Sequence, residues 1–239
     1  MALEFLRIGL APDYVDYLDG WDRQRVLHER VLTGSSPGTV LLLEHFPVYT
    51  AGKRTEEHER PFDGTPVVAV DRGGKLTWHG PGQLVGYPIL RLPDPSKVSD
   101  YVATLEDALI AVLADYGITG ERVAGRSGVW VRGGGPDRKI AAIGIRVNHG
   151  VTMHGFALNC SNDLAPYNQI IACGITDAGT TSISAETGQT VTPADLVARV
   201  EQELFNRREH LVREHPVPAT DTHPPESGTA AGRSKGALL

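Results

Sequence analysis

Two long apolar runs near the middle of the chain constrain its fold most strongly. Residues 139–147 and 151–160 both have the composition of β-strands, and only Asn148-His149-Gly150 separates them. A short linker containing Asn and Gly between two such runs is typical of an antiparallel hairpin. The sequence therefore predicts a β-hairpin, and the rest of the fold has to cover its apolar residues.

The remaining apolar patterns predict helices and strands around this hairpin. Residues 100–116 have helical periodicity, with Ser99 as the expected cap and Gly117 as the stop, and another helix is expected to begin at Thr192-Pro193. The other expected elements are a helix over 14–33 and strands over 40–44, 67–70, 84–90 and 128–131. This order predicts an α+β fold, a mixed β-sheet with packed helices.

The domain boundary is expected near residue 213. Residues 1–213 form the predicted catalytic domain, whereas residues 214–239 contain mainly Pro, Thr, Gly, Ser and Ala and no aromatic residue. Such a composition does not bury a core, so we expect a disordered tail.

Composition limits the class of protein. Hydrophobic residues make up 41% of the chain, and no run approaches the roughly 18 apolar residues that a membrane span needs. The first residues include an acid at Glu4 and no apolar run that would suit a signal peptide. We therefore expect a cytoplasmic protein. A net charge of −6 argues against general nucleic-acid binding.

The two cysteines are candidates for different roles. Cys160 and Cys173 lack CxxC spacing, and we expect both to be free thiols in a reducing compartment. A cysteine among apolar residues is usually an inert core residue, which suits Cys160. Gly174 would leave the sulfur of Cys173 open to a substrate and its own backbone N–H available to an oxyanion. Cys173, which also stands among apolar residues, is therefore either an inert core residue or a reactive thiol.

A glycine-rich segment over 71–84 is the most unusual part of the sequence. It contains four glycines and a proline beside Arg, Thr, His and Gln, and it has neither P-loop nor dinucleotide-binding spacing. Taken alone, it is either a binding site or a plain turn between strands.

Lys139 and its basic neighbours also admit two interpretations. Lys139 opens an apolar strand, where a lysine is either solvated or, beside a cysteine, able to favour the thiolate and exchange a proton. The segment 122–146 contains one acid, Asp137, and six basic residues: Arg122, Arg126, Arg132, Arg138, Lys139 and Arg146. This basic cluster is either a solvated surface or a docking surface for acidic partners.

One apparent motif is excluded. Residues 34–38 match the G-x-S-x-G of serine hydrolases, but that motif requires a strand before it and a helix after it. Here the expected order is reversed.

Taken together, these segments resemble the lipoyl(octanoyl) transferase family. The resemblance rests on Arg72-Gly-Gly-Lys-Leu-Thr-Trp-His-Gly-Pro-Gly-Gln-Leu-Val-Gly-Tyr87, Lys139-Ile-Ala-Ala-Ile-Gly144, Thr152-Met-His-Gly-Phe-Ala-Leu-Asn159 and Ala172-Cys173-Gly174-Ile175. The chain departs from the family at Ala172, where proline is usual. The resemblance covers roughly residues 5–210.

The resemblance implies a fold like the catalytic domain of biotin and lipoate protein ligases, and it implies roles for particular residues. Cys173 would be the nucleophile and Lys139 its activator, with His154 and Gly174 in support. The substrate-binding residues would be Arg72, Gly73, Gly74, Lys75, Leu76, Thr77, Trp78, His79, Ala142, Ile143, Gly144, Gly155, Phe156 and Ala157.

The reaction implied by the resemblance moves an octanoyl or lipoyl group from acyl carrier protein to a lysine of a lipoyl domain, without a cofactor or metal. The acceptors would be lipoyl domains of 2-oxoacid dehydrogenase complexes or the glycine cleavage H protein. The alternatives are an ATP-dependent lipoate ligase of the same fold, a zinc protein using His79, His154 and Cys173, and a non-catalytic binding module.

Overall fold

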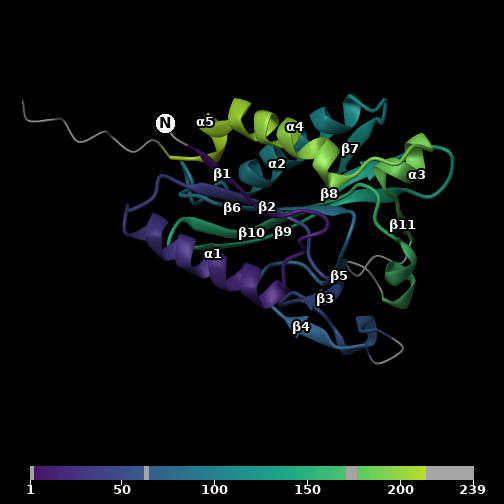
Figure 1. Ribbon diagram of the computed structural model, residues 1–239, viewed down its shortest axis with the longest axis horizontal. Helices are drawn as coiled ribbons and strands as arrows, with labels where there is room; N and C mark the ends of the chain where they lie inside the picture. Colours follow the sequence, from purple (N-terminus) through teal and green to yellow (C-terminus); the bar gives the residue numbers. More distant parts are fainter. Residues whose placement is uncertain (1–2, 62–64, 171–176, 214–239) are drawn as a thin grey trace, which may run out of the picture.

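A mixed sheet with helices on both faces forms the core of the computed structural model (Figure 1), which describes residues 3–61, 65–170 and 177–213. Its strands run in the order β1-β2-β6-β10-β9-β8-β7, and β11 pairs with β9. They are β1 (Glu4–Gly9), β2 (Thr39–Leu43), β6 (Gln83–Ile89), β7 (Gly120–Val123), β8 (Arg126–Val131), β9 (Arg138–Asn148), β10 (Val151–Asn159) and β11 (Gly179–Thr180).

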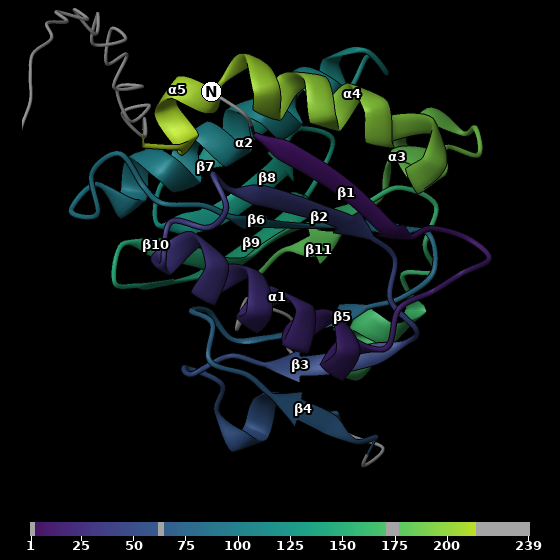
Figure 2. The same cartoon turned by 60° about the vertical axis from the view of Figure 1, so that its left-hand side comes forward.

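The helices divide between the two faces of this sheet, as both views show (Figures 1 and 2). Helices α2 (Val98–Ala114), α4 (Pro193–Asn206) and α5 (Arg208–Leu211) cover one face, while α1 (Tyr17–Leu32) covers the other. Three further helical segments in the described residues are short: η1 (Glu57–Glu59), η2 (Ala165–Gln169) and α3 (Ile183–Thr187). The predicted α+β fold is therefore confirmed.

A smaller sheet lies on the α1 side of the molecule (Figure 2). Its strands run in the order β4 (Val67–Ala69), β3 (Val48–Ala51) and β5 (Leu76–His79). Strand β4 was predicted from the sequence, whereas β3 and β5 were not. Strand β5 lies inside the glycine-rich segment, where Leu76 and Trp78 face a small apolar cluster. Their alternation with Thr77 and His79 is the period-2 signal that would have revealed the strand.

The hairpin that the sequence predicts is confirmed. β9 and β10 pair antiparallel from Val151 opposite Asn148 to Leu158 opposite Ala141. His149 and Gly150 connect them with φ of 50° and 76°, the left-handed conformation that a tight hairpin turn requires. The two strands lie next to each other within the larger sheet, so apolar residues of the hairpin are covered from both sides.

Helix ends agree with the sequence in two cases and differ in one. Thr192 and Asp195 form a capping box at the start of α4, with Pro193 in the first turn. Gly117 follows α2 with a φ of 71°. Ser99 is not the cap of α2, because the helix begins earlier, at Val98, where a turn from Asp94 to Lys97 already supplies backbone hydrogen bonds.

Three further expectations concern parts of the chain away from the core. Residues 34–38 do follow a helix and precede a strand, which excludes the serine-hydrolase motif. Residues 214–239, the predicted tail, lie outside the described residues. No helix in the described ranges is both long enough and apolar enough to cross a membrane.

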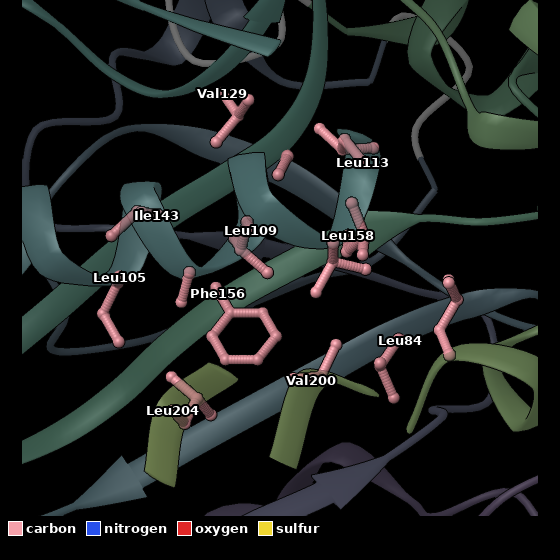
Figure 3. Close-up of a cluster of buried hydrophobic side chains, with 14 of the residues drawn as sticks. Leu84, Leu105, Leu109, Leu113, Val129, Ile143, Phe156, Leu158, Val200 and Leu204 are labelled. Atoms are coloured by element: carbon pink, nitrogen blue, oxygen red, sulfur yellow. The ribbon is translucent and has the colours of Figure 1, made fainter. Parts of the chain in front are cut away.

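The main core lies between the larger sheet and helices α2 and α4. Figure 3 shows Leu105, Leu109 and Leu113 of α2 facing strand residues that include Phe156 and Leu158. Close packing extends to the backbone, because a Cβ added at Gly86 of β6 would overlap the Phe156 ring.

We expect Gly86→Ala to destabilise the fold. Adding a methyl group beneath a buried aromatic ring forces strand β6 or Phe156 to move, which costs about 1–3 kcal/mol. Chemical denaturation would measure this loss. Gly179→Ala is the matched control, because its added Cβ would meet Arg138 at an ordinary 3.7 Å, and it should change stability little. Equal losses in both variants would contradict the packing argument.

Candidate active site

A cavity of about 220 Å³ brings most of the sequence-predicted site residues together. Its wall combines the glycine-rich segment and β5 with β9 and β10 of the larger sheet. The predicted residues that line it are Arg72, Gly74, Lys75, Thr77, His79, Lys139, Ala142, Ile143, Gly144, His154, Gly155, Phe156 and Ala157.

Three predicted binding residues have other positions. Leu76 and Trp78 are buried on the opposite side of β5, where they pack with Tyr49. The Gly73 N–H donates to the carbonyl of Ile145 at 2.8 Å, which joins the glycine-rich segment to β9. These residues support the wall from outside the cavity.

The structure adds wall residues that the sequence analysis missed: Tyr17, Arg54, Tyr87, Gly125, Arg126 and Ser127. Tyr87 is the last residue of the 72–87 motif of the family resemblance, and this membership could have identified it as a site residue. Tyr17 falls within the helix expected over 14–33, and residues 125–127 belong to no motif of the resemblance.

Arg72 holds the glycine-rich segment against the smaller sheet. Its buried guanidinium donates to the Thr50 carbonyl and to Thr50 Oγ1, both at 2.9 Å, and to the Lys75 carbonyl at 2.8 Å. Backbone N–H groups of Lys53 and Arg54 donate to the carbonyls of Arg72 and Gly74 at 3.1 and 3.2 Å. This network satisfies a buried charge with carbonyl dipoles and sets the shape of the wall.

Lys139 lies inside the sheet rather than at an edge. Its strand β9 pairs with β8 on one side and with β11 on the other, where Thr180 lies opposite Lys139. The side chain is half-buried and reaches the cavity. Of the two interpretations of this lysine, the structure disfavours the solvated edge residue.

Two buried histidines form part of a neutral polar layer beside the cavity. Burial lowers the pKa of His79 to about 3 and that of His45 to about 4. His79 Nδ1 lies 2.8 Å from Gln83 Oε1. His45 Nδ1 donates to the Val15 carbonyl at 2.9 Å, so its Nε2 accepts the hydroxyl proton of Tyr87 at 2.7 Å.

His154 occupies a kink in β10. Its φ is 58°, unusual for a residue other than glycine, and its Nε2–H donates to Asp71 Oδ1 at 2.8 Å. Burial lowers the pKa of His154 although Asp71 opposes the shift. Burial alone would raise the pKa of Asp71, but the hydrogen bond from His154 and the charge of Arg146 hold it below its usual value.

The two cysteines differ in what the structure describes. Cys160 is fully buried in the main core, its thiol donates to the Leu158 carbonyl at 3.3 Å, and burial raises its pKa. This agrees with the inert role expected for it. Cys173 and Gly174 lie outside the described residues.

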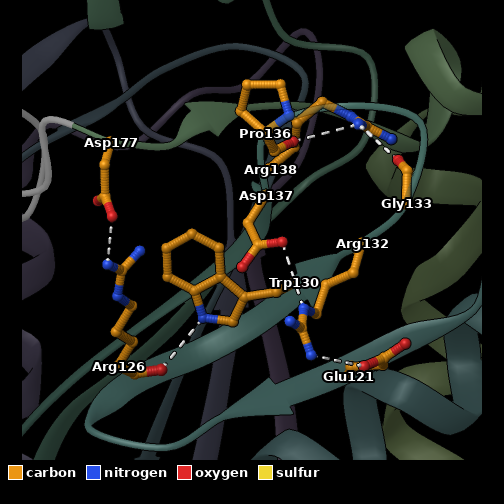
Figure 4. Close-up of polar contacts among 9 residues, drawn as sticks. All are labelled: Glu121, Arg126, Trp130, Arg132, Gly133, Pro136, Asp137, Arg138 and Asp177. Carbon is orange, nitrogen blue, oxygen red and sulfur yellow. Dashed lines mark hydrogen bonds and ion pairs between the residues drawn. The ribbon is translucent and has the colours of Figure 1, made fainter.

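The arginines of the basic cluster over 122–146 all pair with acids, most of which come from other segments of the sequence. Figure 4 shows Arg126 paired with Asp177 and Arg132 between Glu121 and Asp137. The Arg126–Asp177 distance is 2.6 Å. The other arginines pair likewise: Arg122 with Asp107, Arg138 with Glu186, and Arg146 with Asp71. The arrangement favours the solvated-surface interpretation over a strongly charged docking patch.

A metal site also depends on side chains brought together by the fold. Within residues 3–61, 65–170 and 177–213, no group of three or more His, Cys, Asp or Glu side chains is arranged to hold a metal ion.

Comparison with known proteins agrees with the sequence resemblance. Residues 16–205 match the lipoyl protein ligase A/B catalytic domain. An octanoyltransferase of Arthrobacter sp. (strain FB24) is 66% identical over 214 residues, covering 89% of this chain and 96% of that protein. An octanoyltransferase of Renibacterium salmoninarum is 62% identical over 228 residues, covering 93% and 98%.

Solved structures with the same fold have much lower identity. A bipartite lipoate protein ligase from Thermoplasma acidophilum superposes with a TM-score of 0.65 at 12% identity, covering 92% of this chain and 88% of that one. P. falciparum LipL1, in complex with lipoate, gives 0.64 at 12% identity, covering 90% and 65%. These structures establish the fold alone. Because the family match and the similarity to octanoyltransferases extend over most of the sequence, the chain is an acyltransferase that belongs to the lipoyl(octanoyl) transferase family.

Proposed function

We propose that this protein transfers an octanoyl or lipoyl group from acyl carrier protein to a lysine of a lipoyl domain, through a thioester on Cys173. The observation that carries the proposal is the position of Lys139. Its half-buried side chain reaches a cavity whose wall is built from the family motifs. A cation held there would favour the thiolate of a neighbouring cysteine.

The proposed reaction has two acyl transfers. The Cys173 thiolate attacks the donor thioester carbonyl, the bond to the carrier sulfur breaks, and the carrier leaves as a thiol after taking a proton. The amine of the acceptor lysine then attacks the acyl-cysteine, and the Cys173 sulfur leaves as the amide forms. Lys139 would exchange the protons in both steps. The first step trades one thioester for another, so no nucleotide is needed.

The first described residue after Cys173, Asp177, contacts a residue of the cavity wall. Asp177 follows Cys173 by four residues, and its carboxylate accepts from Arg126, which lines the cavity. Four residues span at most roughly 14 Å when extended. This reach supports the pairing of Cys173 with Lys139 in one site.

Small residues of β9 and β10 line part of the cavity, where Gly144 and Gly155 also allow Arg72 and the Gly86 backbone to approach closely. Gly144 lies opposite Gly155, and Ala142 lies opposite Ala157, so two successive cross-strand pairs on one face carry little or no side chain. An acyl chain lying along this face would contact backbone and methyl groups, and each methylene removed from water contributes about 0.8 kcal/mol.

The histidines of the wall suit this chemistry because they stay neutral. His79 lines the cavity and His45 lies behind the wall, next to Tyr87, and burial lowers their pKa values to about 3 and 4, so both are uncharged near pH 7. They supply hydrogen bonds beside the acyl group without adding positive charge that would compete with Lys139.

An ATP-dependent lipoate ligase is the main alternative, since solved ligases have this fold. That chemistry needs no cysteine nucleophile, whereas Cys173 stands in the Cys-Gly-Ile setting of the transferases. The octanoyltransferase names of relatives at 56–66% identity support the transferase. As part of the same proposal, the acceptors are lipoyl domains of 2-oxoacid dehydrogenase complexes or the glycine cleavage H protein, and the reaction takes place in the cytoplasm.

Incubation with octanoyl carrier protein should add one octanoyl group to the wild-type enzyme, on a thioester that hydroxylamine removes. Cys173→Ser should abolish this adduct and transfer to a lipoyl domain, as intact-mass spectrometry and a transfer assay would show. Cys160→Ser is the matched control and should keep most activity if thermal unfolding confirms that it folds. An adduct that persists in Cys173→Ser would refute the assignment.

Lys139→Ala should shift the pH profile of Cys173 alkylation toward higher pH and cut transfer by at least about tenfold. Lys139→Arg should restore the alkylation profile more than the transfer rate, because arginine keeps the charge but does not readily give up a proton. An unchanged profile in Lys139→Ala would exclude Lys139 from activating the thiol.

The free energy of unfolding should fall as pH decreases from about 6.5 toward 4. In this window a histidine of the unfolded chain binds a proton, while His45 and His79 remain neutral in the folded protein, so acid favours unfolding. Each of these histidines contributes a slope of about 1.4 kcal/mol per pH unit. His79→Gln and His45→Gln should each remove one such contribution in denaturant titrations, and unchanged slopes would contradict the neutral assignment.

A further inference from the structure

A β-bulge places Lys139 directly opposite Trp130. Val129 of β8 pairs with Ala141 of β9, but the next residue, Trp130, pairs with Lys139, so β9 carries one additional residue, Ile140, across this step. Opposed residues of an antiparallel pair share one face of the sheet. Without the bulge, Trp130 would lie opposite Ile140. Bulges of this kind re-aim side chains near functional sites.

The two side chains make a cation–π contact. Lys139 Nζ lies 4.7 Å from the centroid of the Trp130 ring, inside the roughly 6 Å over which such contacts are attractive. The ring itself is held in place, because it is 1% exposed and its Nε1–H donates to the Arg126 carbonyl at 3.1 Å (Figure 4). Trp130 does not line the cavity, so it supports Lys139 from behind.

Carboxylates around Lys139 have other partners. Among the residues that the structure describes, no carboxylate oxygen lies within 4.0 Å of Lys139 Nζ. Asp137 pairs with Arg132, Glu186 pairs with Arg138, and Asp177 pairs with Arg126. Glu106, buried on α2, accepts the Gly128 N–H at 2.8 Å. Its carboxylate also attracts Lys139 through its charge, without forming an ion pair with it. The indole face is therefore the direct contact that the described structure supplies to this ammonium.

We propose that Trp130 is a positioning residue, whose ring holds the Lys139 ammonium at the cavity wall. The inference rests on the proposed function, in which Lys139 activates the Cys173 thiol. A carboxylate in this position would neutralise the lysine and weaken its effect on the thiol. An aromatic face attracts the ammonium and leaves its charge intact, which is what an activating cation requires.

If this contact positions Lys139, the reactivity of the Cys173 thiol should depend on the electron density of the Trp130 ring. Fluorine atoms on the indole weaken its attraction for a cation while changing its size little. If ring attraction holds Lys139, successive fluorination moves the ammonium away from the thiol, and the thiolate fraction at neutral pH falls. A ring that only fills space would be insensitive to this change.

The test is site-specific replacement of Trp130 by mono-, di- and trifluorinated tryptophan in the full-length enzyme. The measurements are the alkylation rate of Cys173 at pH 7 and the single-turnover rate of acyl-enzyme formation from octanoyl carrier protein. Both should fall stepwise with each fluorine, by between about 2-fold and about 30-fold in total, the range that a cation–π contact spans. Rates that stay constant across the series would overturn the proposal.

The same series at Trp21 is the matched control. Its ring lies 4.1 Å from the Arg25 guanidinium on α1, a contact of the same kind away from Lys139. Fluorination there should leave both rates unchanged, and an equal fall at Trp21 would overturn the proposal.

A second background separates positioning from packing. In Lys139→Ala, fluorination of Trp130 should no longer alter the alkylation rate, and an effect that persists would assign Trp130 a structural role only. If Lys139→Ala itself alkylates and transfers like the wild type, the proposed function fails together with the inference. If Lys139→Ala is impaired while fluorination has no effect, the inference alone fails.

Discussion

The antiparallel pairing of β9 with β10 is the constraint on which the rest of the structure depends. Residues distant in sequence become direct neighbours through it, such as Gly144 opposite Gly155. Helix α1 packs on one side of this pair and α2 on the other, so both apolar faces are buried. Because the side-chain period in a strand is two, a shift of one residue in this register would turn the small residues away from the cavity.

Irregular backbone at two positions orients polar side chains in directions that regular strand pairing would not allow. The left-handed φ of His154 and the bulge before Ala141 interrupt the ladders on either side of the cavity. Each interruption redirects a polar side chain, His154 toward Asp71 and Lys139 toward Trp130. Strained or irregular positions persist where the surrounding pairing compensates for their cost, and they are frequent at functional sites.

Local patterns predicted the elements whose stability is local. The 148–150 turn and the Thr192 cap depend on residues adjacent in sequence, and both were identified correctly. Strands β3 and β5 were missed because each is four residues long and is stabilised by the other, together with the Arg72 guanidinium bound to Thr50. The basic cluster stayed open between two interpretations at the level of sequence, since its neutralising acids include Asp71 and Glu186, which are distant in sequence.

The sequence by itself determined the family, because motifs such as 72–87 and 139–144 are contiguous and specific, and the proposal for the reactive side chains rests on the same motifs. Only the tertiary structure decided which residues surround them. Tyr17, Arg54 and Arg126, from three separate segments, line the cavity although the sequence did not predict them there. Trp78 was predicted to line it and packs in an apolar cluster instead. Strand register and helix packing decide these neighbours, and both arise from contacts between segments that no single stretch of sequence contains.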